Sequence, residues 1–425
     1  MSETHRAIEA VWRIESARLI AGLSRITRDV GVAEELAQDA LVAALEQWPE
    51  SGIPDNPGAW LMATAKHRAI DQLRRKKLQR RKHEELGREV ELEQELAEES
   101  FQASVEDELG DDLLRLIFTA CHPVLATEAR VALTLRLLCG LTTAEIARAF
   151  LAPEATVAQR IVRAKRTLAE ARVPFELPPI PELSVRLASV LEVIYLVFNE
   201  GYSATAGEDW IRPALCHDAL RLGRILAELA PREPEVHGLV SLMEIQASRF
   251  GARVGPAGEP VLLMDQDRTR WDHVLVRRGL AALTRAEGLG GGLGPYVLQA
   301  EIAVCHAQAA SAADTDWTRI VALYDALAQI LPTPVVELNR AVAVSMAFGP
   351  AAGLELVDQL IDEPALKGYH LLPAVRADLF MKLGRLDEAR EEFQRAAALT
   401  DNARERLLLL DRAASCGPQA PSISH

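Results

Sequence analysis

One stretch of the chain, residues 56–77, has the pattern of a two-faced helix and sets the first constraint on the fold. Asn56 can cap a helix and Pro57 suits its first turn, so we expect a helix to begin here. At 100° per residue, one side of this helix is apolar. The apolar side is formed by Leu61, Met62, Ala65, Ala69 and Leu73.

The opposite side of the same helix is polar, basic and aromatic. It carries Trp60, Thr64, His67, Asp71 and Arg74, flanked by Arg68 and Arg75. An aromatic ring among cations suits stacking on an unpaired base while the cations hold phosphate. The alternative is a basic surface helix with a half-buried tryptophan and no role in nucleic-acid binding.

A second stretch, residues 141–168, has the pattern of two helices joined by a short turn. On the second helix an apolar stripe is formed by Val157, Ile161, Ala164 and Leu168. The other side carries Thr156, Gln159, Arg160, Arg163, Arg166 and Thr167. Such a helix can enter a major groove, where Arg reads guanine and Gln reads adenine. The same shape also occurs as a plain helical hairpin.

Two modules of this kind, in this order and joined by an acidic spacer, resemble the extracytoplasmic-function sigma factors. The segments that carry the resemblance are 33–41, 59–75, 141–147 and 156–164, and it covers residues 1 to about 176. Proteins of this family direct RNA polymerase to promoters. The resemblance implies a region 2 that binds the polymerase clamp and melts the −10 element, and a region 4 that reads the −35 element.

The resemblance also implies three groups of binding residues. Those expected to face the polymerase clamp are Glu34, Glu35, Gln38 and Asp39. Those expected at the −10 element are Asn56, Trp60, Thr64, His67, Arg68, Asp71, Arg74 and Arg75. Those expected at the −35 element are Thr156, Gln159, Arg160, Arg163 and, on phosphate, Arg166. The turn at residues 152–153 departs from the family because it lacks the usual glycine and polar cap.

The charge of the chain is unevenly distributed. Its 425 residues carry a formal net charge of −14, which opposes binding to DNA. Locally, however, a basic run over residues 66–82 precedes an acidic stretch over residues 84–112. This alternation suits two positive modules joined by a negative strap, and a solvated linker is the alternative for the strap.

Composition predicts an all-α protein, because Leu, Ala, Arg and Glu abound and aromatic residues are only 5%. No apolar run approaches the roughly 20 residues of a membrane span and no signal peptide is visible, so we expect a cytoplasmic protein without membrane contact. The odd count of 5 widely spaced cysteines suits reduced thiols. Three Cys-His pairs do not have the spacing of a metal site, and we expect no metal, no cofactor and no enzymatic activity.

The last 245 or so residues exceed what a minimal sigma factor needs. Prolines over residues 174–181 predict a domain boundary. Helical hairpins are expected over 296–331, 336–361 and 372–399, and the third has the residue spacing of a tetratricopeptide repeat (TPR). Stacked repeats form a concave surface, which suggests a partner-binding or regulatory platform. The alternative is a solenoid that only packs against the sigma modules.

Three phrases of this extension, residues 195–202, 265–271 and 334–343, resemble the subgroup of these sigma factors that has a C-terminal extension of tetratricopeptide character. The expected domains are region 2 (1–82), an acidic linker (83–112), region 4 (113–176), a helical extension (177–290) and TPR-like hairpins (291–425). The sequence thus predicts a sigma factor that binds core RNA polymerase and promoter DNA and is regulated by its extension. The alternative is a polymerase-independent helix-turn-helix regulator with a TPR partner-binding domain.

Overall fold

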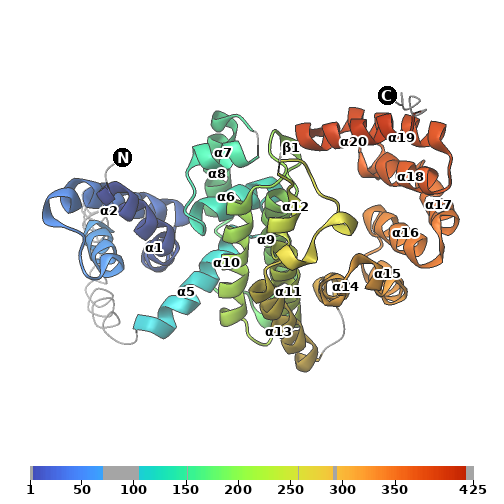
Figure 1. Ribbon diagram of the computed structural model, residues 1–425. Helices are drawn as coiled ribbons and strands as arrows, with labels where there is room; N and C mark the ends of the chain where they lie inside the picture. Colours follow the sequence, from blue (N-terminus) through green and yellow to red (C-terminus); the bar gives the residue numbers. More distant parts are fainter. Residues whose placement is uncertain (1–2, 70–104, 151, 257, 291–293, 418–425) are drawn as a thin grey trace. The chain divides into compact units, whose positions relative to one another are not determined.

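The computed structural model describes residues 3–69, 105–150, 152–256, 258–290 and 294–417. The prediction of an all-α fold is confirmed, since these residues form helices apart from one short parallel pair of strands, β1 (Ala206–Gly207) and β2 (Asp401–Asn402) (Figure 1). Contacts divide the chain into two units, Met1–Ile194 and Tyr195–His425. None of the described helices combines the length and the apolar character that crossing a bilayer requires.

Unit 1 begins with a pair of long helices. Its described helices are α1 (Glu3–Thr27), α2 (Val30–Ser51), a helix over 57–69, α5 (Val105–Ala120), α6 (Thr127–Leu137), α7 (Thr143–Ala149), α8 (Glu154–Glu170) and the first part of α9 (Ile180–Tyr202). Asp29 starts α2 by accepting hydrogen bonds from the backbone N–H groups of Gly31 and Val32, at 2.8 and 3.1 Å. Leu23 and Trp48 are almost completely buried in the core that this pair shares with its neighbours.

The division between the units falls inside α9, beyond the boundary expected at residue 177. The first half of α9 belongs to unit 1 because it binds the end of α5 and the turn that follows. Arg186 donates to the carbonyl of Phe118 at 2.8 Å, and Ser189 donates to the carbonyl of Cys121 at 2.9 Å. The proline-rich segment before α9 is therefore a connection within unit 1.

Unit 2 contains the second half of α9 and the rest of the chain. Its further helices are α10 (Pro213–Leu229), α11 (Pro234–Ala247), α12 (Phe250–Arg253), η1 (Leu263–Asp265), η2 (Arg268–Arg270), α13 (His273–Leu289), α14 (Pro295–Gln308), η3 (Ala312–Asp314), α15 (Trp317–Ile330), α16 (Pro334–Phe348), α17 (Pro350–Asp358), η4 (Pro364–Leu366), α18 (Leu371–Lys382), α19 (Leu386–Leu399) and α20 (Ala403–Ser415). The expected helices are present, and α20 is an addition that the sequence pattern did not suggest.

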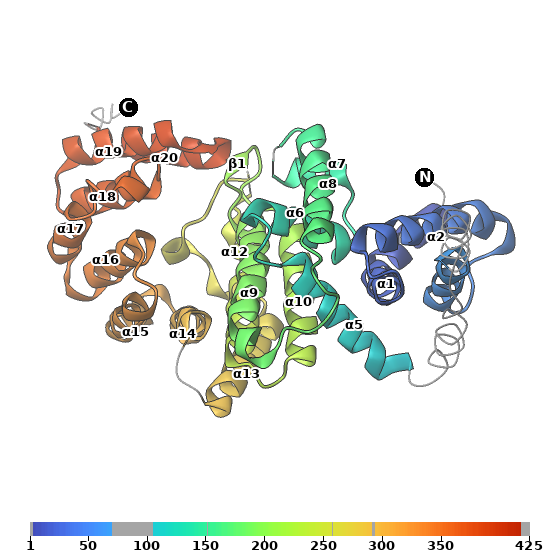
Figure 2. The same cartoon turned by 180° about the vertical axis from the view of Figure 1, so that it is seen from behind.

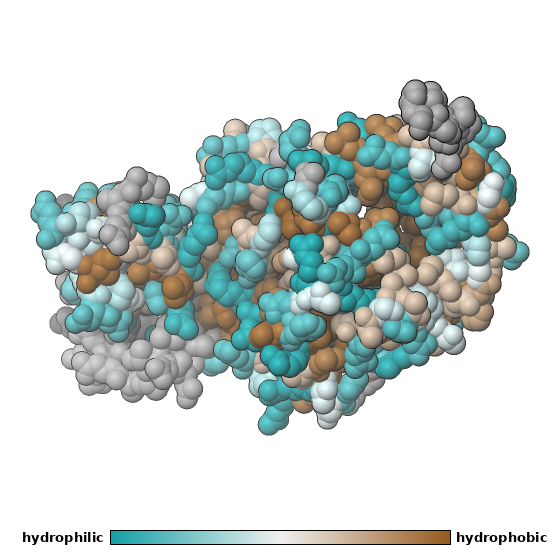
Figure 3. Space-filling model, in the orientation of Figure 1, coloured by the Kyte–Doolittle hydropathy of each residue, from teal (hydrophilic) through white to brown (hydrophobic). Residues whose placement is uncertain are grey.

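The hairpins from α14 to α19 stack side by side in both views (Figure 1, Figure 2). In the last hairpin Ala377, Phe380, Ala389, Phe393 and Ala396 of the expected TPR spacing are buried. Gly384, which belongs to the same spacing, is exposed in the turn between α18 and α19 at φ 77°. Small side chains let α18 and α19 approach, while the two phenylalanines fill the space between them. The surface of unit 2 is hollowed between the loop after α12 and the hairpins (Figure 3).

Asn402 joins the two ends of unit 2. Its side chain is completely buried and donates to the carbonyls of Ala204 and Asp209, at 2.9 and 2.8 Å. Its side-chain oxygen accepts hydrogen bonds from the first backbone N–H groups of α20. One residue thus caps α20 and fixes the segment that follows α9, beside the β1–β2 pair.

Candidate nucleic-acid and polymerase interface

Helices α7 and α8 form the expected helix-turn-helix. A capping box starts α7: the Thr142 hydroxyl accepts from the Glu145 backbone N–H at 3.1 Å, and the Glu145 carboxylate accepts from the Thr142 backbone N–H at 2.8 Å. The hydrogen bonds with Thr142 and the positive charge of Arg13 hold the Glu145 pKa below its usual range, against the opposing effect of burial. The first helix of the pair is therefore firmly started, and α8 follows after a turn of four residues.

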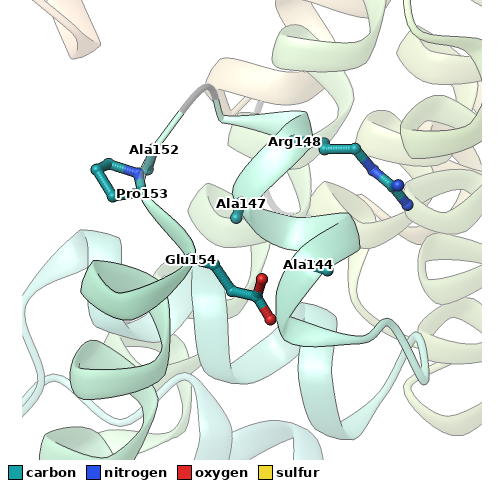
Figure 4. Close-up of a pocket in the computed structure, with 6 residues that line it drawn as sticks. All are labelled: Ala144, Ala147, Arg148, Ala152, Pro153 and Glu154. Carbon is teal, nitrogen blue, oxygen red and sulfur yellow. The ribbon is translucent and has the colours of Figure 1, made fainter.

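An open hollow lies beside this turn, between α7 and α8 (Figure 4). Small side chains, Ala144 and Ala147, line the α7 side, and Pro153 and Glu154 line the start of α8. Pro153 offers no side-chain cap, so the departure noted in the sequence leaves the first N–H groups of α8 without a side-chain acceptor from that position. Glu154 places a negative charge at the helix start, where it interacts favourably with the helix dipole.

The predicted apolar back of α8 is confirmed. Val157, Ile161, Ala164 and Leu168 are all at least nine-tenths buried. Each of these residues lies three or four positions from the next, so together they form one packed stripe. The opposite face of α8 remains available to a ligand.

The residues predicted to read the −35 element lie on that opposite face. Thr156, Gln159 and Arg163 are exposed and Arg160 is half-buried. Gln159, Arg160 and Arg163 line one shallow groove together with the start of α6. Within the described residues, neither Arg160 nor Arg163 forms an ion pair. Arg166, predicted to lie on phosphate, instead binds Glu170 of the same helix at 2.6 Å.

The helix over 57–69 has the cap and the back that the sequence predicted. The Asn56 side chain accepts a hydrogen bond from the Ala59 N–H at 3.0 Å. Leu61, Ala65 and Ala69 are almost completely buried.

Three of the side chains predicted at the −10 element, Thr64, His67 and Arg68, lie at least partly exposed on the outer side of this helix. Trp60 packs edge to face against Trp48, with ring centres 5.3 Å apart. A ring held in this way is pre-oriented for stacking. The other predicted residues, Asp71, Arg74 and Arg75, lie outside the described residues.

The four residues predicted to face the polymerase clamp all lie on α2, but they differ in exposure. Glu35 and Asp39 are exposed, whereas Gln38 is half-buried and Glu34 is only 3% exposed. Arg68 binds the Asp39 carbonyl at 2.8 Å and lies 3.6 Å from its carboxylate. The candidate polymerase-facing helix and the candidate −10 helix are therefore directly joined.

Glu34 is the centre of a buried ion cluster. Its carboxylate accepts from Arg136 of α6 at 2.6 Å, and the Lys165 ammonium of α8 forms an ion pair with the second oxygen. Gln38 donates to the same carboxylate at 2.5 Å. Both cations come from the predicted region 4. Neither Arg136 nor Lys165 lies in a local sequence pattern that would have predicted this contact.

The polar motifs of the extension have structural partners. Glu200 is buried, and its carboxylate binds Arg212 at 2.5 Å and Thr205 at 2.9 Å. Burial raises the Glu200 pKa, although these partners oppose the change. As expected, Asp267 caps a helix: it accepts from the Thr269 N–H at 2.9 Å at the start of η2.

Gly201 follows an apolar run in the sequence, a position that predicts a helix C-cap, and that prediction is wrong. It lies inside α9, where a Cβ would come within 2.9 Å of the Arg212 carbonyl and 2.7 Å of the Cys216 sulfur. Glycine is required here by the close approach of α10. All five cysteines are buried free thiols, and burial raises the pKa of Cys121 to about 11. The described residues contain no group of three His, Cys, Asp or Glu side chains placed to hold a metal ion.

Comparisons with known proteins agree with this geometry. Family models match the chain as sigma-70 region 2 over residues 14–79, sigma-70 region 4 over residues 115–168, and a family of unknown function (DUF6596) over residues 186–287. A protein of Rhizobium meliloti (strain 1021), described as uncharacterized, is 43% identical over 388 residues, which are 91% of this chain and 90% of the relative.

Sigma-70 regions 2 and 4 imply binding to core RNA polymerase and to promoter DNA, and sigma factor families are non-enzymatic regulators. The third match begins inside α9, close to the point where contacts divide the chain. Both the modules and their order are those that the sequence predicted. The chain belongs to the extracytoplasmic-function-like sigma factors, with sigma-70 regions 2 and 4 followed by a C-terminal extension and a role in transcription initiation.

Proposed function

We propose that this sigma factor reads the −35 element through the exposed face of α8 and is regulated by its C-terminal extension. The observation that carries the first part is the contrast between the two sides of α8. Its back is packed, while Gln159, Arg160 and Arg163 share one groove and, among the described residues, have no ion pair that would occupy them. Guanidinium and amide groups in this position match the donor and acceptor pattern of guanine and adenine.

In region 2 the roles divide between two helices. Glu35 and Asp39 of α2 face the polymerase clamp, and Trp60 with His67 and Arg68 acts on the melted −10 strand. Trp60 supplies a ring for stacking, and the nearby cation supplies attraction for phosphate. The Asp39–Arg68 contact keeps both helices in one orientation, so that binding polymerase and melting DNA use a single rigid piece.

Regulation is the second part of the proposal. Glu34 is buried against Arg136 and Lys165, so this carboxylate reaches polymerase only after α2 separates from α6 and α8. The extension is connected to region 4 through α9, whose first half packs on α5. Through this connection, a partner that binds the concave surface of the TPR-like hairpins would change the exposure of α2.

Run-off transcription with core polymerase tests the sigma activity and the extension together. The full chain is compared with chains that end at Pro178 and at Ile194. The chain that ends at Ile194 keeps the α9 contacts to Phe118 and Cys121, so it lacks the rest of the extension without uncovering region 4. Equal transcription by the full chain and the Ile194 chain rejects a regulatory role. Failure of every chain to associate with core polymerase favours the polymerase-independent regulator.

Arg163→Ala tests the reading of the −35 element. We expect a loss of about 1–3 kcal/mol in promoter binding, seen as a drop in transcription that disappears when the −35 sequence is scrambled. Arg166→Ala is the matched control, because Arg166 is already paired with Glu170. An equal loss on all promoters would assign Arg163 to phosphate instead of a base.

A further inference from the structure

Three arginines of unit 2 surround aromatic rings in the segment that follows α11. They are Arg249, Arg253 and Arg268, called the arginine cluster below. The guanidinium carbon of Arg253 lies 3.7 Å from the centre of the Tyr202 ring, and that of Arg249 lies 6.0 Å from the same ring. Arg249 and Arg268 share the Trp271 ring, at 5.5 and 5.3 Å. Two phrases far apart in the sequence, 195–202 and 265–271, thus meet at one place.

Among the described residues, no carboxylate forms an ion pair with the arginine cluster. Arg249 donates to the side-chain oxygen of Gln266 at 3.1 Å, and Arg253 donates to the Tyr202 carbonyl at 2.9 Å. Arg268 donates to the carbonyls at the end of α14. Every one of these acceptors is neutral. The Asp314 carboxylate acts on Arg268 through its charge without forming an ion pair, so the charge that lacks a nearby counter-charge among the described residues is that of Arg249 and Arg253.

The two acidic residues of the same motif do not supply the missing charge. Asp265 is exposed, and Asp267 is exposed and occupied with the cap of η2. Burial and the neighbouring positive charges of Arg253 and Arg268 lower the pKa of Arg249. Burial also lowers the pKa of Arg268, and the negative charge of Asp314 opposes this change. Buried charge without a partner is costly, so its presence requires a reason.

Several hydrogen-bond donors around the cluster are buried and unpaired as well. Within the described residues no acceptor reaches the Nε groups of Arg253 and Arg268, the indole nitrogens of Trp210 and Trp271, or the Tyr202 hydroxyl. Arg253 and Trp271 are only 6% and 4% exposed. Unpaired donors are uncommon in native cores, and a group of them that surrounds positive charge calls for an anionic acceptor.

The cluster can be reached from the surface. Tyr202, Trp210, Arg249 and Arg268 are half-buried and not fully enclosed. His306, which lies near Arg249 and Arg268, is neutral at physiological pH because burial and these two cations lower its pKa to about 4. The charge available to a ligand therefore comes from guanidinium groups alone.

We propose that the arginine cluster is a binding site for a small oxyanion, a carboxylate or a phosphate. A planar guanidinium presents paired donors that match the oxygens of either group. Stacking on Tyr202 and Trp271 holds the three guanidinium groups in place around the site. The proposal goes beyond promoter recognition, because binding here needs neither polymerase nor DNA.

Isothermal titration of the full chain with inorganic phosphate and, separately, with benzoate tests the site directly. Benzoate presents a carboxylate on a flat apolar body, and sodium chloride at matched ionic strength controls for screening. We expect saturable heat from one or both anions and none from chloride. Saturation by phosphate alone or by benzoate alone supports the site and identifies the ligand chemistry. Saturation by neither anion overturns the proposal.

Thermal unfolding then assigns the binding to these residues. At an anion concentration a hundredfold above Kd, mass action predicts a rise in Tm of roughly 5–10 °C for the wild-type chain. Arg249→Met should abolish this rise, whereas Arg277→Met, on the exposed face of α13, should retain it. An equal rise in both variants overturns the assignment.

A second variant, Arg249→Lys, separates the effect of positive charge from that of the planar guanidinium. It also tests the site if Arg249→Met does not fold. Arg249→Lys keeps the positive charge but loses the planar pair of donors. We expect at least a tenfold weaker Kd for this variant. An unchanged Kd would mean that bulk positive charge, and not a built site, attracts the anion. Sigma activity does not enter either measurement, so the two proposals fail independently.

Discussion

In unit 1 a buried carboxylate forms ion pairs with two cations. In unit 2 three buried or half-buried cations share aromatic rings and form no ion pair with any of the described residues. The first group is Glu34 with Arg136 and Lys165. The second is the arginine cluster. Both groups draw on elements far apart in the sequence.

The difference concerns what each group does for the fold. The two cations of the Glu34 cluster pair with a carboxylate inside the protein, and these ion pairs hold α2 against α6 and α8. The arginine cluster has no ion pair among the described residues, so it stabilises the loop through stacking and hydrogen bonds to neutral oxygens. An internal ion pair favours a structural role, whereas cations without one favour a role in binding an anion.

The largest expected effect follows from breaking the ion pairs of Glu34. Glu34→Gln removes the only carboxylate that Arg136 and Lys165 contact among the described residues, and it leaves two cations together with little access to water. We expect a loss of about 3 kcal/mol in the free energy of unfolding of unit 1, measured by urea denaturation. Region 4 should also become more accessible to hydrogen exchange along α8.

Glu35→Gln is the matched control for this change. Glu35 is the next residue on α2 and is exposed, so its loss should cost less than about 0.5 kcal/mol. If both variants unfold at the same urea concentration, the ion cluster contributes no more than a surface charge, and the contrast between the two units disappears.

Local periodicity accounts for most of what the sequence predicted correctly. The apolar stripe of α8 and the buried side of the helix over 57–69 follow directly from spacing, because each is a property of one helix. The sequence also places Asn56 and Asp267 as caps for the same reason. The stripe of α20 is harder to recognise. Four leucines stand in a row, of which Leu409 is buried while Leu407 and Leu410 are exposed, and the residues buried with Leu409 at helical spacing are the small Ala413 and Cys416.

Long-range contacts account for what the sequence did not predict. The boundary inside α9 depends on Arg186 and Ser189 reaching the carbonyls of Phe118 and Cys121. The burial of Glu34 depends on cations that lie more than a hundred residues later in the chain. Neither effect has a local pattern, because a side chain's partner in another helix leaves no periodicity in its own segment.

A pH titration of stability is the next largest test, and it measures the combined effect on His306 of burial and of the positive charges of Arg249 and Arg268. The pKa of His306 is about 4 in the folded protein, against 6.5 for a free histidine. Between these values the unfolded chain binds more protons than the folded chain, so stability falls as the pH drops from about 6.5 to about 4. We expect a loss of about 2 kcal/mol in unit 2 over this range.

His306→Gln should remove most of this loss, and His273→Gln, at an exposed position of α13, should not. Hydrogen exchange of peptides from α14 reports the change locally, which separates it from unit 1. There, burial and Arg186 likewise lower the His122 pKa to about 4. If the loss of stability at low pH persists in His306→Gln, another group is responsible for it. The argument for strong positive charge beside His306 would then be weaker.

The smallest expected effect is the most decisive for the contrast between the two groups. Arg249→Met, in buffer without phosphate or carboxylates, removes one hydrogen bond to Gln266 and stacking on two rings, a cost of about 1–2 kcal/mol. It also relieves repulsion from Arg253 and Arg268, so we expect a net change within about 1 kcal/mol.

Arg136→Met, which leaves Glu34 with one cation fewer, should cost about 2 kcal/mol under the same conditions. Urea denaturation of both variants beside the wild-type chain makes the comparison. If Arg249→Met costs as much as Arg136→Met, then the Arg249 guanidinium stabilises the fold of unit 2 as the Arg136 guanidinium stabilises that of unit 1. A near-neutral Arg249→Met shows instead that the fold does not need this charge, as expected of a residue whose role is to bind a ligand.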